Sequence, residues 1–473
     1  MKIVILHTND LHGHLEHWPI IQEYFDITSR LHDAKGELVL RVDIGDAIDA
    51  VHPLIEATDG QIIIDLFNQA NYHLVTIGNN EGLGLSHDQL KKLYRQANYS
   101  IVLANLIDRE TNELPEWAQA YHVIETQQGP KLYFIGLTAN YQSYILNGYQ
   151  PIDPLEALRW VLDTLPEKQP TDLIIILSHV GYPTDIMIAE QFEEVDLIIG
   201  SHTHHLLSYG EQINQTMLAA AGKYGYYVGQ IELELDDQYL DGSSMIPSKP
   251  WQIDCAVHSI YHLSDITATP IKSDNLVKEG RIKLEEYIIA NLPHAFYADD
   301  FYGENSYIQM ALNAISYKED TDIAILNTGL FLSDIHQGLV SRNHLHESLP
   351  HPMHLVTLTM TGEHMLIMLE QMREKQSSLL EKPINGMGFR GKVFGKLIFK
   401  GLDYRENESN WYYYNQPIQL DKNYQIVTVD HLWFVPFFPA IDQYGSPKLH
   451  FPDFIRHVVG EYLAEKYPLN KTE

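Results

Sequence analysis

Short apolar runs alternate with helical patterns through the first half of the chain. The first run covers 3–6 and leads directly into Asn9-Asp10-Leu11-His12. Runs of this length, rich in Val and Ile, predict strands, and apolar residues spaced three and four apart predict helices. Further strands are predicted at 38–42, 73–77, 173–177, 196–199 and 231–235, and helices at 18–31, 59–70 and 185–193. This order predicts an α/β domain.

The second half has a different pattern. A broad apolar stripe over 274–292 ends at Pro293 and predicts a helix that links the two halves, although the same stripe would suit a core helix. Beyond it, an α+β unit is expected, with Thr361 as the N-cap of one helix. Its predicted elements are helices at 307–316 and 362–371 and strands at 322–326 and 355–360. We therefore expect domains at 1–265 and 295–473, joined by a linking helix at 266–294.

Length and composition describe a globular protein. At 473 residues, 45% of them hydrophobic and 20% charged, the chain suits about two to four domains. An uninterrupted apolar stretch long enough to cross a membrane is missing, and the N-terminal sequence lacks the features of a secretory signal. Cys255 is the only cysteine, so a disulfide framework is excluded. We expect a cytoplasmic protein with no membrane partner; the sequence does not predict its oligomeric state.

The net charge restricts the class of partner. Acidic residues number 63 and basic residues 32, giving a formal charge of −31. That charge repels polyanions and argues against binding of a nucleic acid polymer. A small phosphate ester is still possible, because bound divalent cations reverse the sign locally.

Five loops that follow the predicted strands of the first half offer metal ligands. They contain Asp10, His12, Asp46, Asn79, His179, His202 and His204. Imidazole, carboxylate and amide ligands together suit Mn, Fe, Co or Zn better than Ca. This set is too large for one tetrahedral ion and fits two adjacent ions that share a carboxylate. The set contains no cysteine, which argues against a structural zinc site.

Each of these residues alone has an ordinary explanation. A single His179 is more often a hydrogen-bonded interior histidine than a ligand. Asn79 beside Gly78 suits a turn, and Asp46 after Gly45 suits a helix cap. Five such loops, each at the end of a predicted strand, are much harder to explain as independent accidents.

The motifs in these loops resemble a known family. Asp10-x-His12, Gly45-Asp46-x-x-Asp49, Gly78-Asn79-x-Glu81, His179 and Gly200-x-His202-x-His204 are similar to the motif series of calcineurin-like metallophosphoesterases. The opening Thr8-Asn9-Asp10-Leu11-His12-Gly13-His14 more narrowly resembles the bacterial 5′-nucleotidase, UDP-sugar hydrolase and 2′,3′-cyclic phosphodiesterase family. Asn327-Thr328-Gly329 and Thr361-Gly362-Glu363 extend the resemblance into the second half.

The resemblance implies a fold and a role for each ligand. It implies a four-layer αββα metallophosphoesterase domain followed by a smaller α+β nucleotidase-type domain. The resemblance implies that Asp10, His12 and His204 hold one cation and that Asn79, His179 and His202 hold the other. It implies that Asp46 binds both cations. A hydroxide between the ions would attack phosphorus. Asp49 and Glu81 would orient histidines or loops, and His14 is either such a group or a surface imidazole.

One position in the first half departs from the family. Where the family has a histidine that assists the leaving alkoxide, this chain has Asn80. An amide donates a hydrogen bond to a phosphoryl oxygen but cannot supply a proton, and this loss costs roughly 10²–10⁴ in rate. Either another group supplies the proton, or the substrate has a better leaving group, or the protein is slow. Our hypothesis is that a metal-bound water or a histidine such as His14 substitutes.

The second half also departs from the family pattern. Leu332 stands where the family carries a substrate-binding arginine after Asn327-Thr328-Gly329. The family clamps a nucleobase between two aromatic side chains, and the candidates here are Phe389 and Phe434, with Arg390 as a phosphate partner. Asn327 and Gly329 complete the predicted substrate-binding set. An ordinary core role for these aromatics has equal weight.

The sequence therefore predicts a hydrolase with two divalent metal ions (Mn, Zn, Fe or Co). Its predicted reaction is release of phosphate from nucleoside 5′-monophosphates or related small esters. Two alternatives remain: the same site acts on a cyclic nucleotide or a nucleotide-sugar pyrophosphate, or the protein is a sensor of low turnover. Intact ligands at every predicted position argue against the sensor.

Overall fold

The structure, a computed structural model, describes residues 1–127, 129–240, 250–384 and 388–469. The chain divides into two compact units, Met1–Gly280 and Arg281–Glu473, which are described separately below. Helix α9 (Asn275–Glu286) contains the boundary between them. Among the described residues, no helix is both long enough and apolar enough to cross a membrane.

The first sheet of the N-terminal unit has the order β14-β13-β1-β2-β3-β4. From β1 to β4 neighbouring strands are parallel, and β13 pairs antiparallel with both β1 and β14. The strands are β1 (Lys2–Thr8), β2 (Leu38–Asp43), β3 (Leu74–Val75), β4 (Ser100–Ile101), β13 (Tyr227–Leu235) and β14 (Trp251–Ser259).

The second sheet has the order β11-β12-β10-β9-β7-β6. Its four central strands are parallel, and the two edge strands run antiparallel to their neighbours. The strands are β6 (Tyr121–Glu125), β7 (Lys131–Thr138), β9 (Leu173–His179), β10 (Leu197–Gly200), β11 (Leu206–Ile213) and β12 (Thr216–Ala221). A separate pair is formed by β5 (Leu106–Asp108) and β8 (Tyr149–Pro151).

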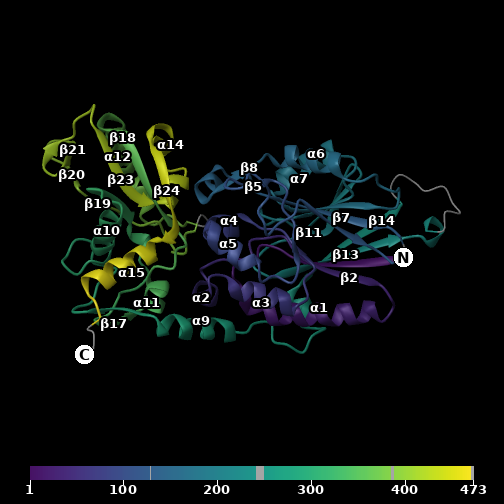
Figure 1. The fold of residues 1–473 in the computed structure, drawn as a ribbon. Helices are drawn as coiled ribbons and strands as arrows, with labels where there is room; N and C mark the ends of the chain where they lie inside the picture. The colour runs from purple at the N-terminus through teal and green to yellow at the C-terminus, as the bar shows by residue number, and fades with distance from the viewer. Residues whose placement is uncertain (128, 241–249, 385–387, 470–473) are drawn as a thin grey trace. The chain divides into compact units, whose positions relative to one another are not determined.

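The two sheets pack against each other and are covered by helices on their outer faces. In β1, Ile3 and Ile5 join a core shared with the second sheet, whereas Val4 and Leu6 join a core shared with helices. This division follows from side chains that alternate between the two faces of a strand. Figure 1 shows α1 and α3 on one side of the strands and α6 and α7 on the opposite side. The predicted four-layer αββα fold is confirmed.

The covering helices have the amphipathic patterns that the sequence predicts. Helix α6, for example, begins after Asp153, whose carboxylate accepts hydrogen bonds from the backbone N–H groups of Leu155 and Glu156. Proline occupies its first turn, where no intrahelical N–H bond is lost. The helices of this unit are α1 (Trp18–Asp33), α2 (Pro53–Ala57), α3 (Gln61–Gln69), α4 (Asn79–Gly84), α5 (His87–Tyr94), α6 (Pro154–Thr164), α7 (Tyr182–Gln191) and α8 (Ile260–Leu263).

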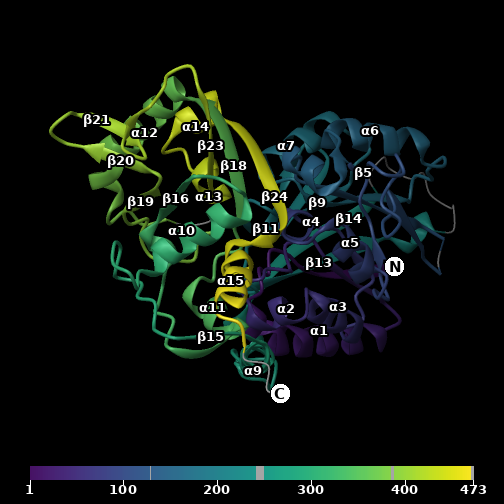
Figure 2. The ribbon, with the colours of Figure 1, turned by 60° about the vertical axis from the view of Figure 1, so that its left-hand side comes forward.

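The C-terminal unit is built on a five-stranded sheet of order β19-β16-β23-β18-β24. Figure 2 shows β18 and β24 running side by side, and they pair antiparallel. The sheet strands are β16 (Ile323–Asn327), β18 (His354–Thr361), β19 (Leu397–Lys400), β23 (Asn423–Val429) and β24 (Ser446–Phe454). The smaller sheets contain β15 (Ile288–Leu292), β17 (Gly338–Ser341), β20 (Leu402–Arg405), β21 (Asn410–Tyr413) and β22 (Gln416–Pro417).

The helices of this unit share one hydrophobic core with its central sheet. Thr361 caps α12 as predicted, accepting a hydrogen bond from the backbone N–H of His364. The helices are α10 (Tyr307–Lys318), α11 (Arg342–Ser348), α12 (Gly362–Leu379), α13 (Asp430–Phe434), α14 (Pro439–Tyr444) and α15 (Ile455–Lys466).

The helix predicted over 274–292 is shorter than expected. It ends at Glu286, and Ile288–Leu292 forms strand β15, which pairs with Gly338–Ser341. The apolar spacing of this segment fits a helix, but the β-branched pair Ile288-Ile289 also suits a strand. A partner strand distant in sequence decides between the two states.

Candidate metal centre

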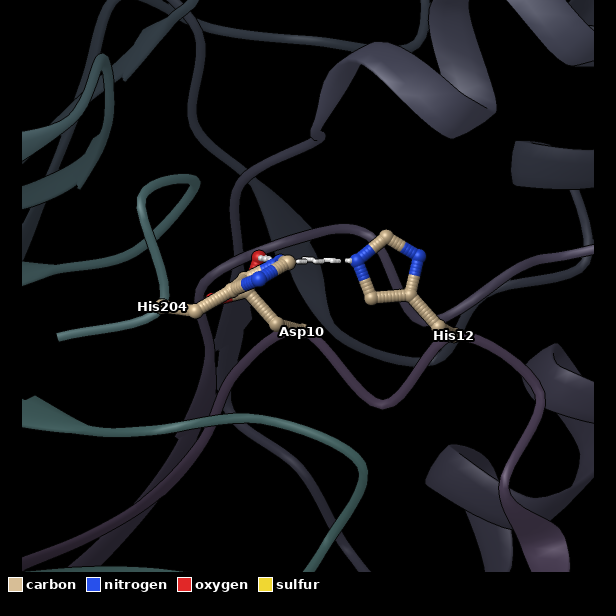
Figure 3. A group of neighbouring side chains, drawn as sticks. All are labelled: Asp10, His12 and His204. Atoms are coloured by element: carbon tan, nitrogen blue, oxygen red, sulfur yellow. Dashed lines mark hydrogen bonds and ion pairs between the residues drawn. The ribbon is translucent and has the colours of Figure 1, made fainter. Parts of the chain in front are cut away.

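Six of the seven predicted ligands form two groups in the N-terminal unit. Asp10, His12 and His204 form the first group, and Asp46, His179 and His202 form the second. Within each group, one ligating atom per residue lies within 4.8 Å of the others. Figure 3 shows the first group, with the carboxylate of Asp10 beside the imidazole ring of His204 and the ring of His12 turned toward both.

The carboxylate of Asp46 faces both groups. Its Oδ2 atom lies 3.4 Å from Nε2 of His179 and 3.6 Å from Nε2 of His12. Its Oδ1 atom accepts a hydrogen bond of 2.8 Å from the backbone N–H of Asn80. One carboxylate therefore lies between the two sets of imidazoles.

The site lies where parallel strands end. Strand β1 precedes Asp10, β2 precedes Asp46, β9 ends at His179 and β10 precedes His202. Residues beyond the carboxyl ends of such strands commonly form ligand sites in α/β folds.

The backbone at the site is strained. Five of the candidate ligands have left-handed φ angles, between 45° and 72°, which non-glycine residues rarely adopt. Such strain persists only where the surroundings impose it, and it concentrates at functional sites. The five residues are Asp10, His12, Asp46, His202 and His204.

Hydrogen bonds hold Asp10 in place. Its backbone N–H donates to the carbonyl of Gly45 at 3.0 Å, which ties the first loop to the second. Ser201 Oγ donates to Asp10 Oδ2 at 2.6 Å, and Asn9 Nδ2 donates to the same oxygen at 3.0 Å. The backbone N–H of His202 donates to Oδ1 at 3.1 Å. Asp10 therefore connects three loops.

Glu81 organises the loop that carries Asp46. Its buried carboxylate accepts hydrogen bonds from the backbone N–H groups of Asp46 and Gly78, each at 2.9 Å, and of Ile48 at 2.8 Å. Gly78 must lack a side chain, because a Cβ there would lie 2.0 Å from Asp46 Oδ1. Glu81 thus orients a loop, which is the role that the resemblance implies.

Two buried polar atoms at the site suit a cation. The Nδ1–H of His179 donates to the Ile44 carbonyl at 2.6 Å, which leaves Nε2 as the acceptor of the neutral ring. That Nε2 atom and Asn79 Oδ1 are both buried without a hydrogen bond to any described residue. Unsatisfied buried polar atoms are costly, and divalent cations would satisfy both. The donor set therefore fits the metals that the resemblance implies.

Burial and neighbouring charges shift the pKa values of the ligands. Burial alone would lower the pKa of His179, but the adjacent Asp46 carboxylate raises it to about 10. For Asp46, His179 and His12 outweigh burial and hold the pKa below its ordinary value. Burial, with a smaller contribution from His12, lowers the pKa of His204 to about 4. The Asp46 carboxylate therefore favours the charged form of His179, whereas burial favours the neutral form of His204.

The three predicted catalytic residues are Asn80, Asp49 and His14. Asn80 and Asp49 contact the ligand His12, and His14 contacts Glu16 and Tyr224. Asn80 Nδ2 lies 2.9 Å from Nδ1 of His12 and 3.4 Å from Oδ2 of Asp49. Asp49 Oδ2 is also 3.6 Å from His12 Nδ1. His14 is half-buried; its Nδ1 lies 3.0 Å from Glu16 Oε1, and its ring centroid is 4.2 Å from that of Tyr224. Their catalytic roles stay predictions.

The predicted substrate-binding residues lie in the C-terminal unit. Phe389 is buried, 3% exposed, between the parallel rings of His351 and His431. Arg390 is next to it, with its backbone N–H donating to His351 Nδ1 at 2.9 Å. Phe434, 43% exposed, stacks on Trp433.

The remaining two positions of that set lie in the loop after β16. Asn327 is fully buried, and its Nδ2 donates to the carbonyl of Phe394 at 2.7 Å. A Cβ at Gly329 would lie 2.0 Å from the carbonyl oxygen of Val393, so the backbone of this loop lies directly against the backbone at Val393. Leu332, which replaces the family arginine, is 45% exposed. None of these contacts assigns a substrate, and the binding roles stay predictions.

Sequence reasoning missed two residues at the metal centre. Tyr141 Oη lies 3.1 Å from Nε2 of His202, and the ring of Tyr224 lies beside those of His12, His14 and His204. Tyr141 follows strand β7. The apolar run 132–137 predicts this strand, so a residue just after it could have been considered as part of the site. No comparable motif marks Tyr224.

Sequence profiles of two families match the chain. The calcineurin-like phosphoesterase profile matches residues 3–206, and the profile of the 5′-nucleotidase C-terminal domain matches residues 288–433. The chain belongs to the calcineurin-like metallophosphoesterases with a 5′-nucleotidase C-terminal domain, which are metal-dependent phosphoric ester hydrolases. The family that the sequence motifs indicate is therefore confirmed.

Individual relatives span the whole chain. It is 32% identical to YunD, an uncharacterized metallophosphoesterase of Bacillus subtilis, over 98% of this chain and 99% of the relative. It is 24% identical to the 5′-nucleotidase of Vibrio vulnificus, over 99% of this chain and 91% of that protein.

Solved structures share the fold. The NAD nucleotidase of Haemophilus influenzae superposes with a TM-score of 0.62 at 16% identity, over 99% of this chain and 97% of that one. The 5′-nucleotidase precursor of Thermus thermophilus gives a TM-score of 0.55 at 19% identity, over 99% and 97%.

Proposed function

We propose that this protein hydrolyses nucleoside 5′-monophosphates, or closely related small phosphate esters, at a centre of two divalent cations. The observation that carries the proposal is the position of Asp46. A single oxygen, Oδ2, lies 3.4 Å from His179 and 3.6 Å from His12, residues that belong to different ligand groups. This is the arrangement expected of a carboxylate shared by neighbouring ions.

Each group would hold one cation. Asp10, His12 and His204 would bind the first; His179, His202 and the buried amide oxygen of Asn79 would bind the second. Mn, Zn, Fe or Co suits this mixture of nitrogen and oxygen ligands. When bound, two such ions supply Lewis acidity toward a phosphoryl oxygen and lower the pKa of water between them.

The protein's own residues position the ligands and the ester. The Asp49 carboxylate, 3.6 Å from the outer nitrogen of His12, would accept the hydrogen on that nitrogen and orient the ring. The Asn80 amide donates toward a phosphoryl oxygen of the substrate, in place of the family histidine. His14, near the first ligand group through Tyr224, supplies the proton to the leaving oxygen.

A nucleotide is the proposed substrate because the phosphoesterase domain is followed by a C-terminal domain of the 5′-nucleotidase type. In the C-terminal unit, the exposed ring of Phe434 offers a surface for base stacking. Asn327, Gly329, Phe389 and Arg390 complete the proposed substrate-binding set. Relatives named 5′-nucleotidase and NAD nucleotidase support nucleotides as the class.

Asn80 favours one second candidate. Because an amide supplies no proton, esters with leaving groups of low pKa would react more readily at this site. A cyclic phosphodiester or a nucleotide-sugar pyrophosphate is therefore the alternative substrate.

A substrate panel separates these possibilities. We would assay the Mn²⁺-loaded protein against nucleoside 5′-monophosphates, a 2′,3′-cyclic nucleotide and UDP-glucose. The proposal expects the highest kcat/KM on a monophosphate, and Asp46→Asn should lower it by about 10²–10³ or more. Asp163→Asn, an exposed site on α6, is the matched control. A metal-loaded protein that cleaves none of these esters overturns the proposal.

The location of the protein is a separate inference. Cys255 is the only cysteine, and burial raises the pKa of its thiol to about 12, so it suits a protein without redox chemistry. The cytoplasmic location stays a prediction.

A further inference from the structure

We propose that Tyr141 is a positioning residue of the metal centre, holding Nε2 of His202 so that Nδ1 of the same ring faces the second cation. The Oη atom of Tyr141 lies 3.1 Å from Nε2 of His202. The two rings meet edge to face, with centroids 5.8 Å apart and planes at 64°. This inference rests on the proposed metal centre and names a residue that its motifs do not contain.

In two other ligand histidines, His179 and His12, the two ring nitrogens face different partners. In His179, Nδ1 contacts the Ile44 carbonyl at 2.6 Å, and Nε2 faces Asp46. In His12, Nδ1 lies 3.6 Å from the Asp49 carboxylate, and Nε2 faces Asp46. One nitrogen binds an outer partner and the other faces the ligand group, as is usual for metal-binding histidines.

His202 reverses this assignment. Its engaged nitrogen is Nε2, so the atom left for a cation is Nδ1. In a neutral imidazole with a metal on Nδ1, Nε2 carries the hydrogen and donates it to Tyr141 Oη. The contact with the phenol oxygen would therefore hold the rotation of the ring, and the hydroxyl would accept the Nε2 hydrogen in the metal-bound form.

The position of Tyr141 suits this role. It follows β7, which pairs with β9 in a register that places Thr138 opposite His179. The side chain thus starts at the same edge of the sheet as the second ligand group. Tyr141 is 41% exposed, so its hydroxyl can be removed without leaving a buried cavity. A residue held only by packing would tolerate Tyr141→Phe with no effect on metal binding.

Cobalt binding tests the inference without relying on turnover. Metal-free wild type, Tyr141→Phe and the control Tyr209→Phe, at a site 84% exposed, would be titrated with Co²⁺ and followed by visible absorption and calorimetry. Two equivalents are expected in wild type and in the control. In Tyr141→Phe, one equivalent should bind as in wild type and the other 10–100-fold more weakly, with an altered absorption band.

A double-variant comparison assigns the weakened site. In a His204→Ala background, which impairs the first group, Tyr141→Phe should still weaken the remaining ion. In a His179→Ala background, which impairs the second group, it should have no further effect. Unchanged binding of both equivalents in Tyr141→Phe, or a loss confined to the first group, overturns the inference. If wild type binds Co²⁺ and Tyr141→Phe weakens it, but no ester is hydrolysed, the proposed function fails and this inference stands.

Discussion

The Nε2 atoms of His12 and His204 lie 3.1 Å apart, although 192 residues separate them in the chain (Figure 3). A neutral imidazole has one donor and one acceptor nitrogen, so two acceptor atoms cannot bind each other. A proton or a cation must therefore lie between these rings. Asp10 Oδ1 lies 3.9 Å from Nε2 of His12 and 3.6 Å from Nε2 of His204, so a cation at this place would have three ligands.

Metal removal should destabilise the N-terminal unit. Cations that bind only the folded state add about 2.7 kcal/mol when present at 100 times their dissociation constant. EDTA should lower the thermal midpoint of this unit, and added Mn²⁺ should restore it. Differential scanning calorimetry measures the shift. Asp46→Asn is the control, since its midpoint should respond much less to EDTA; an equal response would contradict a shared role for that carboxylate.

Gly78→Ala should disrupt the site without changing a ligand. The new Cβ would lie 2.0 Å from Asp46 Oδ1, so the carboxylate must move away from both ligand groups. A displacement of this size should lower kcat/KM by about 10²-fold. The matched control is Gly84→Ala at the end of helix α4, whose N-cap is Gly78; a Cβ at Gly84 meets no atom within 4 Å. Equal activity of the two variants would show that the Asp46 position is unimportant.

Replacement of His14 should affect poor leaving groups most. If His14 donates the proton, His14→Ala should lower hydrolysis of a nucleoside 5′-monophosphate by about 10²–10⁴. Hydrolysis of p-nitrophenyl phosphate, whose leaving group needs no proton, should change much less.

Asn80→His provides the complementary test of proton supply. If His14 already provides the proton, this variant should bring no gain in hydrolysis of the nucleoside monophosphate. A large gain in Asn80→His, together with an unaffected His14→Ala, would contradict the role of His14.

Asp185 should make stability depend on pH. Burial raises its pKa to about 7, although Ser178 Oγ donates a hydrogen bond to the carboxylate. Because the folded-state pKa lies above the unfolded value, the stabilising contribution is present below pH 4 and is lost as pH rises through 7. The loss is on the order of 4 kcal/mol.

Chemical unfolding at pH 5 and pH 8 measures this effect. Wild type should lose stability between these values, and Asp185→Asn should lose less. Asp163→Asn should keep the wild-type dependence. The same pH dependence in Asp185→Asn and wild type would assign the effect to another group.

Local sequence patterns predicted most strands and helices because both are governed by short-range rules. The apolar run 3–6 became β1, and the motif residues fell just beyond the strands, since polar loops follow buried strands in an α/β fold. The strand predicted at 73–77 was reduced to Leu74–Val75, and the helix over 274–292 gave way to β15 after Glu286. In β15, pairing with a distant strand overrode the local pattern.

By itself, the sequence determined the family, the order of elements and the identity of the candidate ligands, because these depend on residue type and spacing. Only the tertiary structure decided which ligands meet, that Asp46 faces both groups, and that Tyr141 contacts His202. The contacts of Asp46 join loops from two different sheets, and the contact of Tyr141 with His202 joins loops after two strands of one sheet. Their geometry depends on how the sheets pack and on left-handed backbone angles at five ligands, neither of which is encoded in local periodicity.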